Sequence, residues 1–106
     1  MKIEEINQFI EKEIERLKGY YKLKSEEELT LAMALKLGEE VGELYNEILA
    51  HKGYQRKEKL NKFNKNEIGN EIADVIFVTF ILSKVFNIDI EDSLNEKMKK
   101  IKERIY

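Results

Sequence analysis

No proline interrupts the 106 residues of this chain, and apolar residues recur at helical spacing along most of it. Proline lacks the backbone donor that a helix interior needs, so its absence leaves every helical hydrogen-bond ladder intact. Alanine, leucine, isoleucine, glutamate and lysine are plentiful, and most of these side chains lose little rotamer freedom in a helix. We therefore predict an all-α fold, and the length suits a single domain that spans residues 1–106.

Apolar periodicity and capping signals divide the chain into four predicted helices. Ser25, Asn64 and Asp89 are suited to cap the starts of the second, third and fourth helices. Gly19 is suited to end the first helix. The helices span about residues 2–17, 25–50 and 64–86, and the fourth begins near residue 89. We expect these helices to form an antiparallel four-helix bundle.

Three of the predicted helices carry an apolar stripe, which we expect to face the core. The stripes consist of Ile3, Ile6, Ile10, Ile14 and Leu17 in the first helix, Leu37, Val41, Leu44 and Ile48 in the second, and Leu94, Met98, Ile101 and Ile105 in the fourth. The third helix is instead apolar on nearly every side. Such a helix is normally enclosed by other helices or by a partner subunit, so we expect an oligomer.

Residues 51–64 show no clear periodicity and are rich in lysine and arginine. Loops of this length are uncommon in a small domain and are often functional or mobile. A mobile lid over a site and a solvated connection between helices both fit this pattern. We favour the solvated connection.

Composition excludes several classes of protein. The chain has no cysteine and a single histidine, His51, which excludes disulfides, thiolate zinc sites and histidine-rich metal sites. The 19 basic and 21 acidic residues nearly balance, so the charge gives no indication of nucleic-acid binding. No apolar run reaches the roughly 18 residues that a membrane helix needs. The acidic N-terminal turns are unlike a targeting peptide, so we expect a cytoplasmic protein.

An aspartate lies within the apolar third helix. From residue 72 to residue 82, only Asp74 and Thr79 are not apolar. An ionised carboxylate that leaves water needs a partner or a metal ion, or it takes up a proton. Glu71 lies one turn before Asp74 and about 60° away around the helix axis, so the two carboxylates can point the same way.

The second helix repeats this arrangement, because Glu40 and Glu43 share a face beside the apolar stripe. If the second and third helices pack antiparallel through their stripes, the two acidic pairs can face each other. Two like charges at about 4 Å repel by roughly 4 kcal/mol at an effective dielectric near 20, so such a cluster needs a cation. Oxygen ligands without histidine or cysteine favour Mg²⁺ or Mn²⁺ over zinc.

A second interpretation of the acidic residues needs no metal. The acidic face of the second helix can be solvated and can pair with Lys36 or Lys52. Asp74 can be neutralised by a lysine from another helix. Because about a fifth of the chain is acidic, the spacing alone does not decide between the two interpretations.

Two stretches of the chain resemble the MazG-like, all-α nucleoside triphosphate pyrophosphohydrolases. Residues 35–44, with the sequence LKLGEEVGEL, are similar to the EExxE segment of that family. Residues 70–77, with the sequence NEIADVIF, are similar to its ExxD segment. The resemblance covers roughly residues 29–104. It implies a MazG-like bundle that hydrolyses nucleoside triphosphates to monophosphate and pyrophosphate, with Mg²⁺ or Mn²⁺ as the cofactor.

The resemblance also implies roles for individual residues. The implied metal ligands are Glu40, Glu43, Glu71 and Asp74. We predict catalytic roles for Glu39 and Glu40. Glu39 would orient or deprotonate the attacking water, or support the metal ligands, and an ordinary surface acid is the alternative. The predicted substrate-binding cations are Lys36, Lys97 and Arg104. Of these, Lys97 and Arg104 match cations of the family, whereas Lys36 can reach the site or only screen Glu40.

The expected partners and substrate contacts also rest on the resemblance. Family members form dimers or tetramers, so the resemblance implies a homodimer or homotetramer. We assign no residue to the recognition of the base. The candidates for stacking on a base are His51, Tyr54, Phe63 and the pair Tyr20 and Tyr21. In a small bundle, however, aromatic residues more often belong to the core or to an interface.

Three other functions are compatible with parts of the sequence. Phosphoribosyl-ATP pyrophosphohydrolase, from the same superfamily, shares the chemistry and differs in substrate. A helical interaction module without turnover would explain the apolar third helix. It would not explain clustered carboxylates, for which a scaffold has no physical need. Nucleic-acid binding ranks last, because an acidic cluster without metal repels phosphate.

Overall fold

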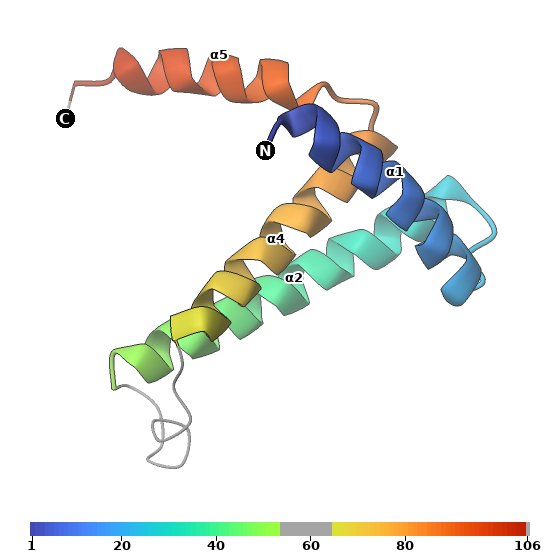
Figure 1. Ribbon diagram of the computed structural model, residues 1–106, viewed down its shortest axis with the longest axis horizontal. Coiled ribbons are helices and arrows are strands. Elements are labelled where there is room, and N and C mark those ends of the chain that lie inside the picture. The colour runs from blue at the N-terminus through green and yellow to red at the C-terminus, as the bar shows by residue number, and fades with distance from the viewer. Residues whose placement is uncertain (54–64, 106) are drawn as a thin grey trace.

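The computed structural model describes residues 1–53 and 65–105, and these residues form four helices and no strand. The helices are α1 (Ile3–Tyr20), α2 (Glu26–His51), α4 (Lys65–Val85) and α5 (Ile90–Lys102) (Figure 1). The prediction of an all-α chain with four helices is thus confirmed. The expected cap at Asn64, most of the basic segment, Tyr54 and Phe63 lie outside the described residues.

Local side-chain chemistry sets the helix starts as expected. The Ser25 hydroxyl accepts a hydrogen bond from the backbone N–H of Glu28 (3.1 Å) at the start of α2. The Glu28 carboxylate in turn accepts from the backbone N–H of Lys24 (2.6 Å), one residue before the position that a capping box uses. Asp89 caps α5 by accepting from the N–H of Asp92 (3.2 Å). These bonds satisfy donors that a helix start would otherwise leave unpaired.

The first helix does not stop at Gly19 but continues to Tyr20. Its end is set by Lys22, which adopts a left-handed backbone with φ of 54°. That conformation lets the N–H of Leu23 donate to the carbonyl of Lys18 (2.9 Å), the closing bond of a common helix end. The chain reverses there without using the glycine.

Three helices enclose the core. Helices α2 and α4 lie side by side and antiparallel, and α1 crosses them near the end of α4 (Figure 1). The predicted stripe of α1 faces inward, with Ile10 fully buried. The predicted stripe of α2 is displaced, because its end at Ile48 is exposed and Leu29 and Met33 are buried instead. The core therefore lies towards the start of α2, where α1 covers the pair.

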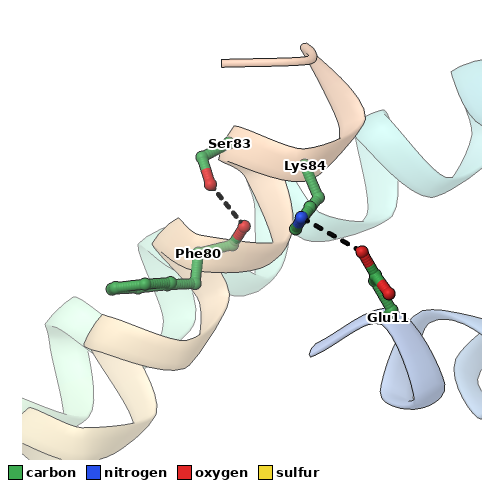
Figure 2. A network of polar contacts seen from close by, with 4 residues as sticks. All are labelled: Glu11, Phe80, Ser83 and Lys84. Atoms are coloured by element: carbon green, nitrogen blue, oxygen red, sulfur yellow. Dashed lines mark hydrogen bonds and ion pairs between the residues drawn. The ribbon is translucent and has the colours of Figure 1, made fainter. Parts of the chain in front are cut away.

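One ion pair fastens α1 to α4. The Lys84 ammonium lies 3.2 Å from a carboxylate oxygen of Glu11 (Figure 2). Exposed pairs of this kind contribute only about 0–1 kcal/mol, so the apolar contacts hold α1 in place. Beside it, the buried hydroxyl of Ser83 donates to the carbonyl of Phe80 (2.7 Å), so this polar group is satisfied within α4.

The replacement Ile10→Ala is expected to lower the free energy of unfolding by about 2–5 kcal/mol, because Ile10 is the side chain through which α1 enters the core. Urea unfolding followed by circular dichroism measures this loss. Ile105→Ala, at an exposed position beyond α5, is the matched control and should change stability by less than about 0.5 kcal/mol. Equal losses in the two variants would contradict this account of the core.

The fourth helix takes a position that the sequence did not predict. Helix α5 extends from the end of α4 away from the other helices (Figure 1), and none of its residues is buried. Its predicted core residues Leu94, Met98 and Ile101 are consequently exposed. Helix α4 also leaves Ile72 and Ile76 exposed, as its nearly uniform apolarity suggested. Among the described helices, none combines the length and the apolarity needed to cross a membrane.

Candidate metal and substrate site

Three carboxylates from two helices meet at one point. Glu40 and Glu43 extend from α2 and Glu71 extends from α4, and one oxygen of each lies within 4.8 Å of the others. The two glutamates of α2 are one turn apart, so they share a face. Helices α2 and α4 pack antiparallel (Figure 1), and this packing brings that face against Glu71. The structure therefore brings together three of the four predicted metal ligands.

The three carboxylates differ in burial, since Glu43 is exposed, Glu71 is half-buried and Glu40 is buried, which is unusual for an acidic residue. Glu40 is only 6% exposed. One oxygen of Glu40 and one oxygen of Glu71 are buried without a hydrogen-bond partner among the described residues. Buried carboxylate oxygens that lack a donor call for a ligand, because leaving them unsatisfied destabilises the fold.

Electrostatics within the cluster point the same way. The negative charge of Glu40, followed by burial, raises the pKa of Glu43 above its ordinary value of 4.5, and Glu71 adds to the effect. Glu43 thus resists losing its proton beside the charge of Glu40, because like charges this close repel each other. A donor set of carboxylate oxygens alone suits a hard divalent cation such as Mg²⁺ or Mn²⁺. The residues present thus fit a metal of that class.

Asp74, the fourth predicted ligand, lies beside this group rather than within it. Burial, followed by the charge of Glu40, raises the pKa of the Asp74 carboxyl, whereas Lys36 lowers it. Asp74 is therefore close enough to feel the charge of Glu40. Together with Lys36 it lines a separate cavity.

The Lys36 ammonium lies 3.3 Å from a carboxylate oxygen of Glu40 and 3.9 Å from one of Glu39. The hydrogen bond to Glu40 raises the pKa of Lys36, which keeps its positive charge at the edge of the cluster. Of the two roles left open for Lys36, the structure shows the screening of Glu40. The Glu39 side chain is largely exposed, so it lies at the solvent side of this lysine.

Lys97 and Arg104 do not join the cluster of their own chain. Lys97 is on α5 and Arg104 follows its end, and both are exposed. Because α5 extends away from the pair formed by α2 and α4 (Figure 1), the structure does not bring these cations to the three carboxylates.

A cavity of about 240 Å³ lies beside the cluster, between α1, α2 and α4. Its wall contains Lys36 and Asp74 together with the aromatic residues Phe9, Tyr21 and Phe77. Sequence reasoning assigned no role to Phe9 or Phe77. Phe77 could have been found, because it follows Asp74 by one helical turn and so shares its face. Phe9 had no such signal, since only the crossing of α1 places it there.

Comparison with known proteins gave one result. Residues 28–105 match the family described as the MazG nucleotide pyrophosphohydrolase domain. Neither the curated proteins nor the solved structures gave a match. The matched region contains all three clustered carboxylates and Asp74, and it covers well over half of the chain. The chain therefore belongs to the MazG nucleotide pyrophosphohydrolase family.

Proposed function

We propose that this protein hydrolyses nucleoside or deoxynucleoside triphosphates to the monophosphate and pyrophosphate, with Mg²⁺ as the cofactor and Mn²⁺ as a substitute. The observation that carries the proposal is the cluster of Glu40, Glu43 and Glu71, with its buried and unpartnered oxygens. The cluster lies within the region that matches a family of nucleotide pyrophosphohydrolases. Triphosphates bind to proteins largely through Mg²⁺, which bridges carboxylates and phosphates.

Glu40, Glu43 and Glu71 would hold the metal, and Asp74 would complete the set from the next turn of α4. When bound, Mg²⁺ neutralises phosphate charge and promotes the formation of a nucleophile from water. The same ion would satisfy the buried oxygens of Glu40 and Glu71. Substrate binding would then depend on metal binding, because the carboxylates without a metal repel a negatively charged substrate.

The chain's own residues supply the remaining functions. Glu39, which is largely exposed beside Lys36, would accept a proton from the attacking water. The water oxygen forms a bond to the α-phosphorus, and the bond from that phosphorus to the bridging oxygen breaks. Pyrophosphate leaves with the bridging oxygen, and the proton passes to Glu39. Lys36, which now screens Glu40, would be free to contact phosphate once a cation takes over that charge.

The test is a panel of ribo- and deoxyribonucleoside triphosphates and phosphoribosyl-ATP, incubated with Mg²⁺ or with EDTA. We expect pyrophosphate and monophosphate in the presence of Mg²⁺ and no reaction with EDTA. Turnover of phosphoribosyl-ATP alone would assign the chain to that reaction of histidine biosynthesis. No turnover of any compound by folded protein would favour a helical interaction module. The cytoplasmic location expected from the sequence stays a prediction.

We also propose that the protein is a homodimer or homotetramer. The apolar side chains of α5 and the exposed Ile72 and Ile76 of α4 provide a surface that a second copy can cover. In such an assembly, α5 could deliver Lys97 and Arg104 to the cluster of a neighbouring chain. This arrangement would give the two cations the substrate-binding role that they cannot have within their own chain.

Placing a charge in the middle of the α5 surface is expected to split the assembly. Met98→Lys should shift the mass measured by sedimentation towards the monomer, because an ammonium buried without a partner is strongly unfavourable. Glu96→Gln, on the opposite side of α5, makes the same change in net charge and should leave the mass unaltered. A parent protein that is already monomeric at micromolar concentration would refute the oligomer.

A further inference from the structure

The cavity between α1, α2 and α4 lies next to the proposed catalytic site. Two residues of its wall, Lys36 and Asp74, are also neighbours of the carboxylate cluster. Lys36 pairs with Glu40 at 3.3 Å, and Asp74 responds to the charge of Glu40. A triphosphate held at the cluster would therefore lie next to this cavity.

The rest of the cavity wall has a different character. Apart from Glu13, Lys36 and Asp74, its lining consists of apolar and aromatic side chains. Phe9 of α1 and Phe77 of α4 contact each other at a centroid distance of 5.5 Å, with their rings tilted by 50°. Tyr21 lines the wall from the segment that follows α1. Phe9 and Phe77 line the cavity and are 50% and 38% exposed, so part of each side chain is accessible to a ligand.

The volume limits what the cavity can hold. About 240 Å³ is below the range of roughly 300–1,000 Å³ that is usual for sites enclosing a drug-sized molecule. A whole nucleotide is too large, whereas a single flat heterocycle fits. Aromatic side chains bind nucleobases by stacking, because every base presents a π face.

We propose that this cavity receives the base of the nucleotide, with Phe9, Tyr21 and Phe77 as its contacts. The inference rests on the proposed function, since it identifies the base subsite of the same reaction. It also assigns a role to α1, which lies outside the region matched to the family. Helix α1 and the turn after it supply Phe9 and Tyr21, so residues outside the matched domain would recognise the substrate.

The experiment measures the binding of nucleoside 5′-monophosphates by calorimetry, with ribose 5-phosphate and inorganic pyrophosphate as ligands that lack a base. The parent protein should bind at least one of the four common monophosphates more tightly than it binds ribose 5-phosphate. Phe9→Ala and Phe77→Ala should each weaken the binding of that monophosphate by about 5- to 150-fold, the range expected for loss of one stacking contact. Both variants should bind pyrophosphate as the parent does.

Phe86→Ala is the matched control. Phe86 directly follows the end of α4, is 61% exposed, and does not line the cavity, so its removal should leave the binding of all three ligands unaffected. In turnover, Phe77→Ala should raise KM for the triphosphate and leave kcat nearly unchanged, since stacking acts equally on substrate and transition state.

The outcomes separate this inference from the proposed function. Base-dependent binding that disappears in Phe9→Ala and Phe77→Ala supports the subsite, even if no triphosphate is cleaved. Cleavage of triphosphates by variants that bind monophosphates as tightly as the parent overturns the subsite and leaves the proposed function standing. Equal binding of monophosphate and ribose 5-phosphate by the parent also overturns it.

Discussion

The replacement Glu40→Gln is expected to lower the rate of triphosphate cleavage by about a hundredfold or more without destabilising the metal-free protein. Loss of a residue that merely supports a metal ligand typically costs 10- to 100-fold in affinity or activity, so loss of a central ligand should cost at least as much. Glu40 is central here, because it is the most buried acid of the cluster and the one that perturbs both Glu43 and Asp74.

Stability should respond in the opposite direction to activity. Glutamine fills nearly the same volume as glutamate but does not repel Glu43 and Glu71. The variant loses the ion pair with Lys36, whose contribution is small for a partly exposed lysine. The metal-free variant should therefore unfold at a urea concentration equal to or above that of the parent.

Two measurements check this prediction, namely the initial rate of pyrophosphate release and the urea midpoint in EDTA. Glu15→Gln, a solvated acid on α1 that pairs only with Lys18 among the described contacts, is the control and should retain both values. A Glu40→Gln protein that is much less stable than the parent would instead show that Glu40 has a structural role.

Magnesium is expected to stabilise the protein, and to do so more strongly at pH 7 than at pH 5. An ion that binds only the folded state at a hundred times its Kd stabilises by about 2.7 kcal/mol. The pKa values of Glu43 and Asp74 are raised in the folded chain, so ionising these groups destabilises the metal-free fold. The contribution of these two groups to stability is therefore lost as the pH rises through their folded pKa values, above 4.5 for Glu43.

Bound magnesium reverses this dependence, because the ion needs the deprotonated ligands and protons compete with it at low pH. Urea unfolding at pH 5 and pH 7, with Mg²⁺ and with EDTA, measures both effects. Glu43→Gln should weaken the pH dependence in EDTA and the stabilisation by Mg²⁺ together. A stabilisation by Mg²⁺ that is absent, or that is equal at the two pH values, would argue against a carboxylate metal site.

The sequence predicted those features of the fold that depend on neighbours along the chain. Helix starts at Ser25 and Asp89 follow from side-chain bonds to residues three positions ahead. The burial of Ile10 follows from the spacing of one stripe. Displacement of the α2 core towards Leu29 and Met33 could not be predicted, because it depends on where α1 crosses. The position of α5 is likewise not encoded in its own sequence. Its amphipathic pattern predicts an apolar face but does not say which helix or partner that face contacts.

In the candidate site, too, the sequence predicted some features and not others. Spacing on one helix predicted that Glu40 would share a face with Glu43, and the antiparallel order of two helices placed Glu71 opposite them. The pairing of Lys36 with Glu40 was one of the two roles that spacing left open for this lysine. Spacing could not predict that Glu40 would be the most buried of these acids. The contact between Phe9 and Phe77 joins residues far apart in the chain, so no local pattern indicates it.

The most direct test of the central claim is hydrolysis of a triphosphate in ¹⁸O-labelled water with Mg²⁺, with the products analysed by mass spectrometry. Attack on the α-phosphorus predicts unlabelled pyrophosphate and one labelled oxygen in the nucleoside monophosphate, with no reaction in EDTA or with Glu40→Gln. Label in the pyrophosphate would place the attack on the β-phosphorus, and release of labelled orthophosphate would place it on the terminal phosphorus. Either result would contradict the proposed pyrophosphohydrolase reaction.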